Sequence, residues 1–388
     1  MELLWLLLPV AAASGWWAAR RRPVDCQGVT IRNADYFKGL NYLIDDQPDQ
    51  AIEVFTRMAD IDRDTAEIHL ALGNLFRRRG EVDRAIHIHG SLITRVNLTA
   101  DQRSRAMLEL GEDYLRAGLF DRAEELFQKL LDQPDHTIIA SSRLIHIFQQ
   151  EKDWRQAIAY SDRLEQISGE SKRRQTAHFC CELAETANAQ NRHEEAGTWL
   201  QDALKRDSSC TRANLLLGRL AMRTGNYPAA IAAFQAVEQQ DRGYLPEVIA
   251  PLGQCYGALN RLDEWIAYLR DVQARDHGGR ITDALAEWLL RQEGEEAALQ
   301  FLERELREYP TLLGLRRLVE IKLARGKGAE YADLRALHCI STQMLNGAAR
   351  YRCGYCGFVV KSLHWWCPSC LQWSTIKPMP DLVMKTSA

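Results

Sequence analysis

A spacing pattern that recurs along most of the chain limits the folds open to it. A small residue is followed three positions later by an aromatic or apolar residue, usually twelve positions later by alanine, and sixteen positions later by an aromatic or aliphatic residue. Gly39, Tyr42, Ala51 and Phe55 form the first copy. The copies begin at Gly39, Gly73, Gly111, Ile145, Ala184, Gly218, Gly253 and Leu285, which are 32 to 39 residues apart.

This period is typical of the tetratricopeptide repeat, a pair of helices joined by a short turn. The small residues let the paired helices approach closely, and the aromatic residues fill the space between repeats. Gly80, Gly118, Gly225 and Asn260 mark the turns, because these residue types tolerate a left-handed backbone. A single repeat cannot bury its apolar face alone, so the copies stack into one superhelix. We therefore expect an all-α array of about eight to nine repeats over residues 33–340.

The first helices of such repeats form a concave surface that binds peptides or protein surfaces. Six polar residues have the helical phase of this surface: Asn74, Arg77, Arg78, Arg116, Arg219 and Arg223. Arginines in this arrangement favour a groove that grips an acidic or C-terminal peptide segment. The alternative interpretation of the same residues is a solvated polar face.

A second motif lies near the C-terminus, where Cys353, Cys356, Cys367 and Cys370 form two C-x-x-C pairs. Each pair can form a tight turn, and two such turns supply a tetrahedral four-thiolate metal site. A unit of about 30 residues is too small for a core of its own, so the ion would hold residues 350–378 together. Iron and zinc both suit four thiolates. Two disulfides are the alternative, but scattered free cysteines elsewhere favour a reducing compartment.

Three tryptophans lie close to these cysteines in the sequence. Trp365, Trp366 and Trp373 offer apolar surface with two possible uses. One is docking of the metal-binding unit back onto the repeats as a clasp. The other is merely covering the metal.

The N-terminus has the features of a membrane anchor. Residues 3–19 carry no charge, and Arg20, Arg21 and Arg22 follow directly. This run is near the lower length limit of a membrane-spanning helix, and the arginines keep the following chain in the cytoplasm by the positive-inside rule. A cleavable signal peptide is the competing interpretation, but it would carry its positive charge before the apolar run. Residues 1–22 are therefore expected to anchor the chain in the membrane.

Composition and motifs argue against other classes of function. The chain has 49 Lys and Arg residues against 52 Asp and Glu residues. This near-balance gives no support for nucleic-acid binding. The sequence lacks a phosphate-binding glycine loop, a G-x-S-x-G motif and an H-E-x-x-H motif. The chain is therefore expected not to be an enzyme.

The order of anchor, repeats and tetracysteine unit closely resembles the lipopolysaccharide assembly protein B family of Gram-negative bacteria. Five stretches carry the resemblance: residues 6–13, 69–89, 177–184, 351–358 and 366–378. It implies that residues 350–378 form a rubredoxin-type domain that binds iron, with the four cysteines at the family's ligand positions. It also implies a location on the cytoplasmic face of the inner membrane.

The resemblance further implies a regulatory function. Members of the family lower lipopolysaccharide synthesis by helping a membrane-anchored AAA metalloprotease degrade the lipid A pathway deacetylase. An inner-membrane lipopolysaccharide sensor opposes this role, and the family is also linked to gathering the biosynthetic enzymes at the membrane. Two alternatives stay open: a rubredoxin-like electron-transfer protein, and an envelope-assembly scaffold without a proteolytic role.

Overall fold

The computed structural model describes residues 35–379, except 43, 46, 62–64, 327, 329 and 330. The chain divides into two compact units, Met1–Glu151 and Lys152–Ala388. The predicted anchor at residues 1–22 lies outside the described residues. Within the described part of the chain, none of the helices combines the length and the apolar character that a membrane span needs.

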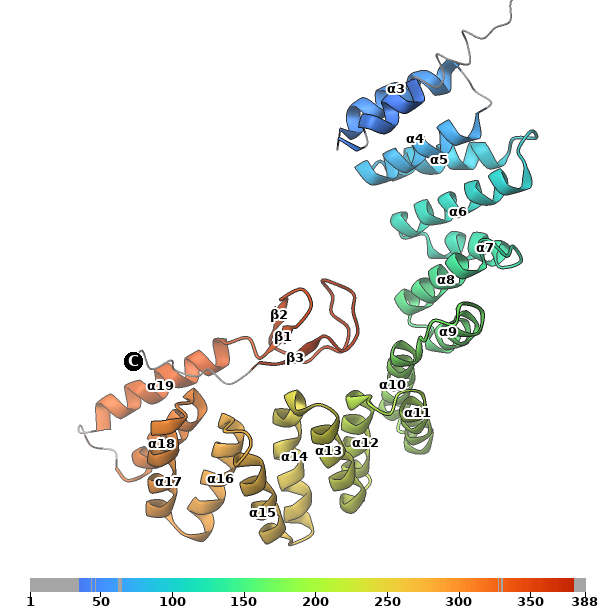
Figure 1. Cartoon of the computed structure of the whole chain (residues 1–388). Helices are drawn as coiled ribbons and strands as arrows, with labels where there is room; N and C mark the ends of the chain where they lie inside the picture. Colours follow the sequence, from blue (N-terminus) through green and yellow to red (C-terminus); the bar gives the residue numbers. More distant parts are fainter. Residues whose placement is uncertain are drawn as a thin grey trace, which may run out of the picture. The chain divides into compact units, whose positions relative to one another are not determined.

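The first unit consists of antiparallel helices in which each helix packs on the next (Figure 1). Residues 35–42 are helical and precede the named elements. The helices that follow are α3 (Pro48–Ile61), α4 (Ala66–Arg79), α5 (Val82–Ile93), α6 (Ala100–Ala117), α7 (Phe120–Leu130) and α8 (Thr137–Glu151).

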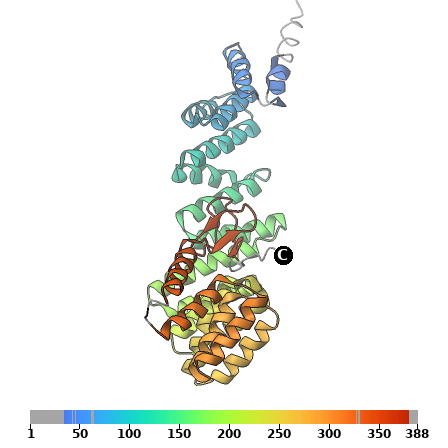
Figure 2. The ribbon, with the colours of Figure 1, turned by 90° about the vertical axis from the view of Figure 1, so that its left-hand side faces the viewer.

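The second unit continues the same helical pattern and ends in a small sheet. Its helices are α9 (Trp154–Ser168), α10 (Arg173–Ala189), α11 (His193–Arg206), α12 (Thr211–Arg223), α13 (Tyr227–Gln240), the 3-10 helix η2 (Arg242–Tyr244), α14 (Leu245–Ala258), α15 (Leu262–Gln273), α16 (Gly279–Gln292), α17 (Glu295–Glu308), α18 (Leu312–Ala324) and α19 (Ala332–Gly347). The strands β1 (Tyr351–Cys353), β2 (Val359–Val360) and β3 (Ile376–Pro378) follow. In both views the strands lie against one side of the helical array (Figures 1 and 2). The predicted all-α repeat architecture with a small C-terminal unit is confirmed.

Glycine and phenylalanine residues sixteen positions apart pack against each other and hold the two helices of a repeat together. A Cβ atom added to Gly111 would lie 2.7 Å from Phe127 Cζ, and one added to Gly218 would lie 2.4 Å from Phe234 Cε1. Gly39 has the same relation to Phe55, at 2.8 Å. The ring therefore takes the space that any side chain at the glycine would need. This contact explains the sixteen-residue spacing in the sequence.

The four predicted turn residues adopt the expected conformation. Gly80, Gly118 and Gly225 have φ of 88°, 75° and 77°, and Asn260 has φ of 55°. Gly80 and Gly118 directly follow α4 and α6, and their N–H groups donate to carbonyls of the last helical turn. These left-handed residues end the first helix and let the chain reverse into the second.

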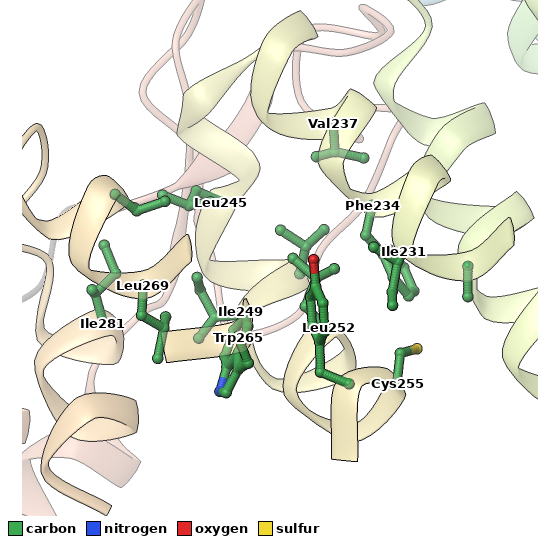
Figure 3. Packing of buried hydrophobic residues seen from close by; sticks show 14 of the residues in the cluster. Ile231, Phe234, Val237, Leu245, Ile249, Leu252, Cys255, Trp265, Leu269 and Ile281 are labelled. Atoms are coloured by element: carbon green, nitrogen blue, oxygen red, sulfur yellow. The ribbon is translucent and has the colours of Figure 1, made fainter. Parts of the chain in front are cut away.

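Buried apolar residues join successive repeats into one core in the second unit. Phe234 of α13, Leu252 of α14 and Leu269 of α15 are each fully buried in a single cluster (Figure 3). Trp365, from the segment between β2 and β3, packs against the same cluster. The core of the repeats therefore extends to the tetracysteine unit.

We expect Gly111→Ala to lower the free energy of unfolding by about 1–3 kcal/mol, because its methyl group would overlap the Phe127 ring. Gly90→Ala is the matched control, since Gly90 is also helical and a Cβ there would meet nothing within 4 Å. Alanine is the better helix former, so this variant should be up to about 1 kcal/mol more stable. Denaturant unfolding measures both, and equal effects of the two substitutions would contradict the packing argument.

Candidate metal centre and its contacts with the repeats

The four cysteines are positioned by a three-stranded antiparallel sheet in the order β2-β1-β3. Tyr351 pairs with Val360 on one side, and Cys353 pairs with Ile376 on the other. The Gly354 N–H donates to the Thr375 carbonyl at 2.7 Å, which continues the second pairing into the first turn. The sheet thus presents the first C-x-x-C pair at its end.

The two C-x-x-C turns have the same backbone conformation. Gly357 N–H donates to Cys353 O at 3.0 Å, and Leu371 N–H donates to Cys367 O at 2.8 Å. Gly357 and Leu371 each follow the second cysteine of their pair, with φ of 78° and 58°. A left-handed leucine is uncommon, so the turn imposes this conformation on Leu371. The repeated geometry brings two sulfurs from each turn towards one point.

The sulfur positions fit a tetrahedral ion. Cys353 Sγ lies 3.7 Å from Cys370 Sγ, and Cys356 Sγ lies 3.7 Å from Cys367 Sγ. All four sulfurs lie within 4.8 Å of one another. Metal–sulfur bonds of about 2.3 Å in a tetrahedron put neighbouring sulfurs ~3.8 Å apart. The four residues are free thiols rather than disulfides, so the donor set suits a thiophilic ion such as iron or zinc.

The local environment favours the thiolate at Cys353. Burial alone would raise the pKa of this thiol. Hydrogen bonds from the Thr375 side chain and from the backbone N–H groups of Cys356 and Tyr355 outweigh burial and lower that pKa to about 6. A metal ion binds the thiolate form, so these donors prepare the site for an ion.

Trp373 docks the metal-binding unit onto α9 and α10. Its ring stacks on His178 of α10, with 4.9 Å between centroids and 15° between planes. It also meets Phe179 and Trp154 edge-on, at 5.9 and 6.4 Å. Trp366 has a different role. Its ring stacks on Trp373 inside the metal-binding unit, with 6.3 Å between ring centroids.

Trp365 makes a second docking contact. It stacks on Tyr244 of η2 with 5.1 Å between ring centroids. The Arg212 guanidinium lies 6.0 Å from the Trp365 ring and 6.0 Å from the Trp373 ring, within the range of a cation–π interaction. The docking interpretation of Trp365 and Trp373 is therefore confirmed, and Arg212 is a contact that both rings share.

Arg212 is buried but its charge is compensated. Its side chain is 3% exposed and forms ion pairs with Glu182 at 2.8 Å and Glu185 at 2.5 Å, both on α10. A buried charge without a partner would be strongly destabilising. The carboxylates of α10 thus allow a cation of α12 to lie beneath the metal-binding unit.

Four polar contacts complete the interface. His178 Nε2 lies 2.6 Å from Ser374 Oγ, and the Tyr244 hydroxyl donates to Ile376 O at 2.9 Å. The Tyr351 hydroxyl donates to Glu247 Oε1 at 2.8 Å, and Lys377 forms an ion pair with Asp241 at 2.7 Å. These contacts reach from α10 to α14 and fix the orientation of the unit. Sequence reasoning missed the residues on the array side, although His178 lies within the 177–184 stretch of the family resemblance.

The other predicted site, the arginine groove, has a different structural setting at Arg77. The Arg77 guanidinium donates to Asn74 at 2.8 Å, to Asp113 at 2.8 Å and to Glu109 at 2.6 Å. His89 Nδ1 lies 2.6 Å from the second Asp113 oxygen, and both of these side chains are fully buried. Asn74 and Arg77 therefore belong to a network that joins α4, α5 and α6. Their binding of a partner stays a prediction.

The remaining four predicted groove residues are exposed. Arg78 and Arg116 lie in the last turns of α4 and α6, in the first unit. Arg219 and Arg223 lie one turn apart on α12, in the second unit. Arg223 donates to Asn188 at 3.2 Å, and Arg219 lies 4.0 Å from Glu247, the residue that also binds Tyr351. A partner-binding role for these four also stays a prediction.

We expect Cys353→Ser to release the metal ion and unfold residues 350–378 locally, because tetrathiolate sites contribute on the order of 10 kcal/mol to such small units. The repeats should stay helical, since each is stabilised mainly by its neighbours. Elemental analysis measures the loss of the ion, and tryptophan fluorescence measures the local unfolding. Cys339→Ser is the control, because Cys339 is an exposed cysteine outside the cluster. One bound ion per chain in the Cys353 variant would contradict the assignment.

His178 should make stability depend on pH. Burial, followed by the charges of Arg212 and Arg174, lowers the pKa of His178 from 6.5 to about 3. Between these values the unfolded chain binds more protons than the folded one, so stability is full above pH 6.5 and falls as pH falls. One such proton gives a slope of about 1.4 kcal/mol per pH unit.

Denaturant unfolding at pH 7 and pH 5.5 tests this expectation. Most carboxylates stay ionised at both pH values, so they contribute little to the difference. His178→Gln should reduce the loss of stability between the two pH values by about 1 kcal/mol, because glutamine cannot gain the proton. His87→Gln replaces an exposed histidine of α5 and should leave the loss unchanged. Identical pH profiles of the wild type and the His178 variant would contradict the assignment.

Comparison with known proteins agrees with both parts of the architecture. Family models of the tetratricopeptide repeat match residues 38–95, 105–136 and 181–244. A model of the rubredoxin metal binding domain matches residues 351–378, which contain the four cysteines. Among solved structures, a chain of Naa15/Naa10 bound to HypK-THB has a TM-score of 0.46 at 14% identity, covering 82% of this chain and 47% of that chain.

Relatives of nearly the same length are more informative. Lipopolysaccharide assembly protein B of Escherichia coli (strain K12) is 38% identical over 385 residues, which cover 98% of this chain and 99% of the relative. The protein of the same name from Haemophilus influenzae is 35% identical over 395 residues, with the same coverage. Identity at this level extends over the repeats and the metal-binding unit alike. The chain therefore belongs to the lipopolysaccharide assembly protein B family.

Proposed function

We propose that this protein is a non-enzymatic scaffold that regulates lipopolysaccharide assembly at the cytoplasmic face of the inner membrane. The proposal rests on sequence identity to lipopolysaccharide assembly protein B, which is 38% over 98% of the chain. The repeat array suits this role, because repeat arrays offer long surfaces for protein partners. The metal-binding unit also supports this role, because it docks on the repeats and adds its own surface to the one that they offer to partners.

The mechanism that we propose is proteolytic adaptation. The protein would bind the lipid A pathway deacetylase and present it to a membrane-anchored AAA metalloprotease, and an inner-membrane lipopolysaccharide sensor would oppose this step. The protease works in the plane of the membrane, so an adaptor held there meets it at a high effective concentration. Residues 1–22 are the proposed tether. Iron is the proposed ion of the four-thiolate site.

The half-life of the deacetylase tests this mechanism. In cells that lack their own family member, the full-length chain should shorten the half-life, and the half-life should stay long without it. An unchanged half-life together with normal lipopolysaccharide levels would favour the envelope-assembly scaffold without a proteolytic role. Redox cycling of the bound ion with loss of regulation on reduction would favour electron transfer instead.

Deleting residues 1–22 should leave a folded protein that no longer controls lipopolysaccharide levels. The folding information lies in the repeats and the metal-binding unit, whereas the anchor supplies only location. Circular dichroism of the purified variant measures folding, and deacetylase half-life at native abundance measures function. A control with an unrelated single transmembrane helix in place of residues 1–22 should recover function. Normal deacetylase turnover by the untethered variant would rule out tethering as the role of this segment.

A further inference from the structure

A groove of about 890 Å³ lies in the second unit, away from the arginines that the sequence singled out. Its walls come from α14, α15, α16, α18 and the end of α19, and from residues 348–351 and 378–379 next to the sheet. The metal-binding unit therefore forms part of the groove. A volume of this size is in the range of pockets that bind ligands.

All three carboxylates in the groove already have partners. Glu247 accepts the hydrogen bond from Tyr351. Asp283 binds Arg317 through both oxygens, at 2.6 and 3.2 Å. Glu287 forms an ion pair with Arg291 at 2.5 Å. None of these carboxylates forms an ion pair with the remaining arginines of the groove among the described residues.

Three arginines in the groove stay uncompensated. Arg280 of α16, Arg316 of α18 and Arg350 before β1 line it, and none of them forms an ion pair with any residue that the structure describes. The Arg316 Nε is buried and has no hydrogen-bond partner among the described residues. Arg350 directly precedes Tyr351, the first residue of β1, so it lies at the end of the groove next to the sheet. The groove therefore has an excess of positive charge.

The same groove also offers apolar surface. Leu262 of α15 is 40% exposed, and Trp288 of α16 and Leu313 of α18 are partly exposed in the groove. A ligand that contacts helices from α14 to α18 crosses two interhelical spacings of about 10 Å each. An extended chain covers ~20 Å with about six residues. A peptide fits these dimensions better than a small anion does.

We propose that this groove binds an extended segment of a partner protein that carries apolar side chains followed by carboxylates. The carboxylates bind Arg280, Arg316 and Arg350, and the apolar side chains pack on Leu262 and Trp288. The inference names the kind of segment that the proposed scaffold recognises, and it rests on that function for its biological role. Binding is measured on purified protein, so its failure is distinct from failure of the role in lipopolysaccharide assembly.

The test uses the purified chain and fluorescein-labelled octapeptides that contain two leucines and three aspartates, with zero to three serines between the two groups. Fluorescence anisotropy measures Kd. At least one spacing should bind saturably, and the same peptide with asparagine for aspartate, or serine for leucine, should bind at least about tenfold more weakly. Hydrogen bonds to charged groups justify this factor.

Arg280→Gln combined with Arg316→Gln should weaken binding by at least about tenfold without changing the melting temperature by more than a few degrees. Arg261→Gln is the matched control, because this exposed arginine of the same unit lies outside the groove and is paired with Glu264. It should leave Kd unchanged. Equal binding by the double variant, equal binding of the asparagine peptide, or no saturable binding at any spacing would overturn the proposal. Arginine-dependent binding of phosphatidylglycerol vesicles without peptide binding would assign the groove to a lipid surface instead.

Discussion

A ring packed directly against a glycine sets the separation of the two helices in the repeats that contain such a pair. Phe127 on Gly111 and Phe234 on Gly218 leave no room for a methyl group, so the helices meet at the distance that the ring allows. The apolar faces of neighbouring repeats can then join into one core, as they do between α12 and α16. In the second unit, the contact of Phe234 with Gly218 sets this distance between α12 and α13, and Arg212 of α12 contacts the metal-binding unit.

The metal-binding unit is fixed to the array by aromatic and polar contacts in addition to the four-cysteine cluster. Trp365 and Trp373 cover a buried arginine and a neutral histidine, two groups that would be costly to leave in an apolar setting alone. Glu182 and Glu185 compensate the charge of Arg212 from the neighbouring helix. The interface therefore combines apolar packing of Trp365 with directional polar contacts, which fix the orientation of the unit.

Local rules predicted the features that depend on local chemistry. The left-handed residues Gly80 and Asn260 and the four ligand cysteines follow from residue type and spacing. Lys152, which is also left-handed with φ of 61°, could not be predicted, because lysine has no preference for that conformation and the surrounding helices impose it. The pairing of Arg77 with Asp113 and the docking site of Trp373 on His178 depend on contacts between distant residues. Sequence spacing alone carries no information about such contacts.

His89 shows what happens when one repeat departs from the common pattern. It stands where four other repeats have phenylalanine, against Gly73, and its ring also binds Asp113 of the following repeat. Most repeat proteins tolerate shuffling, duplication or loss of units, because each boundary resembles the next. Here the histidine and the aspartate make one boundary unlike the others. Exchanging either repeat alone would leave a buried polar group of the other without its partner, so the pair restricts which repeats can stand next to each other here.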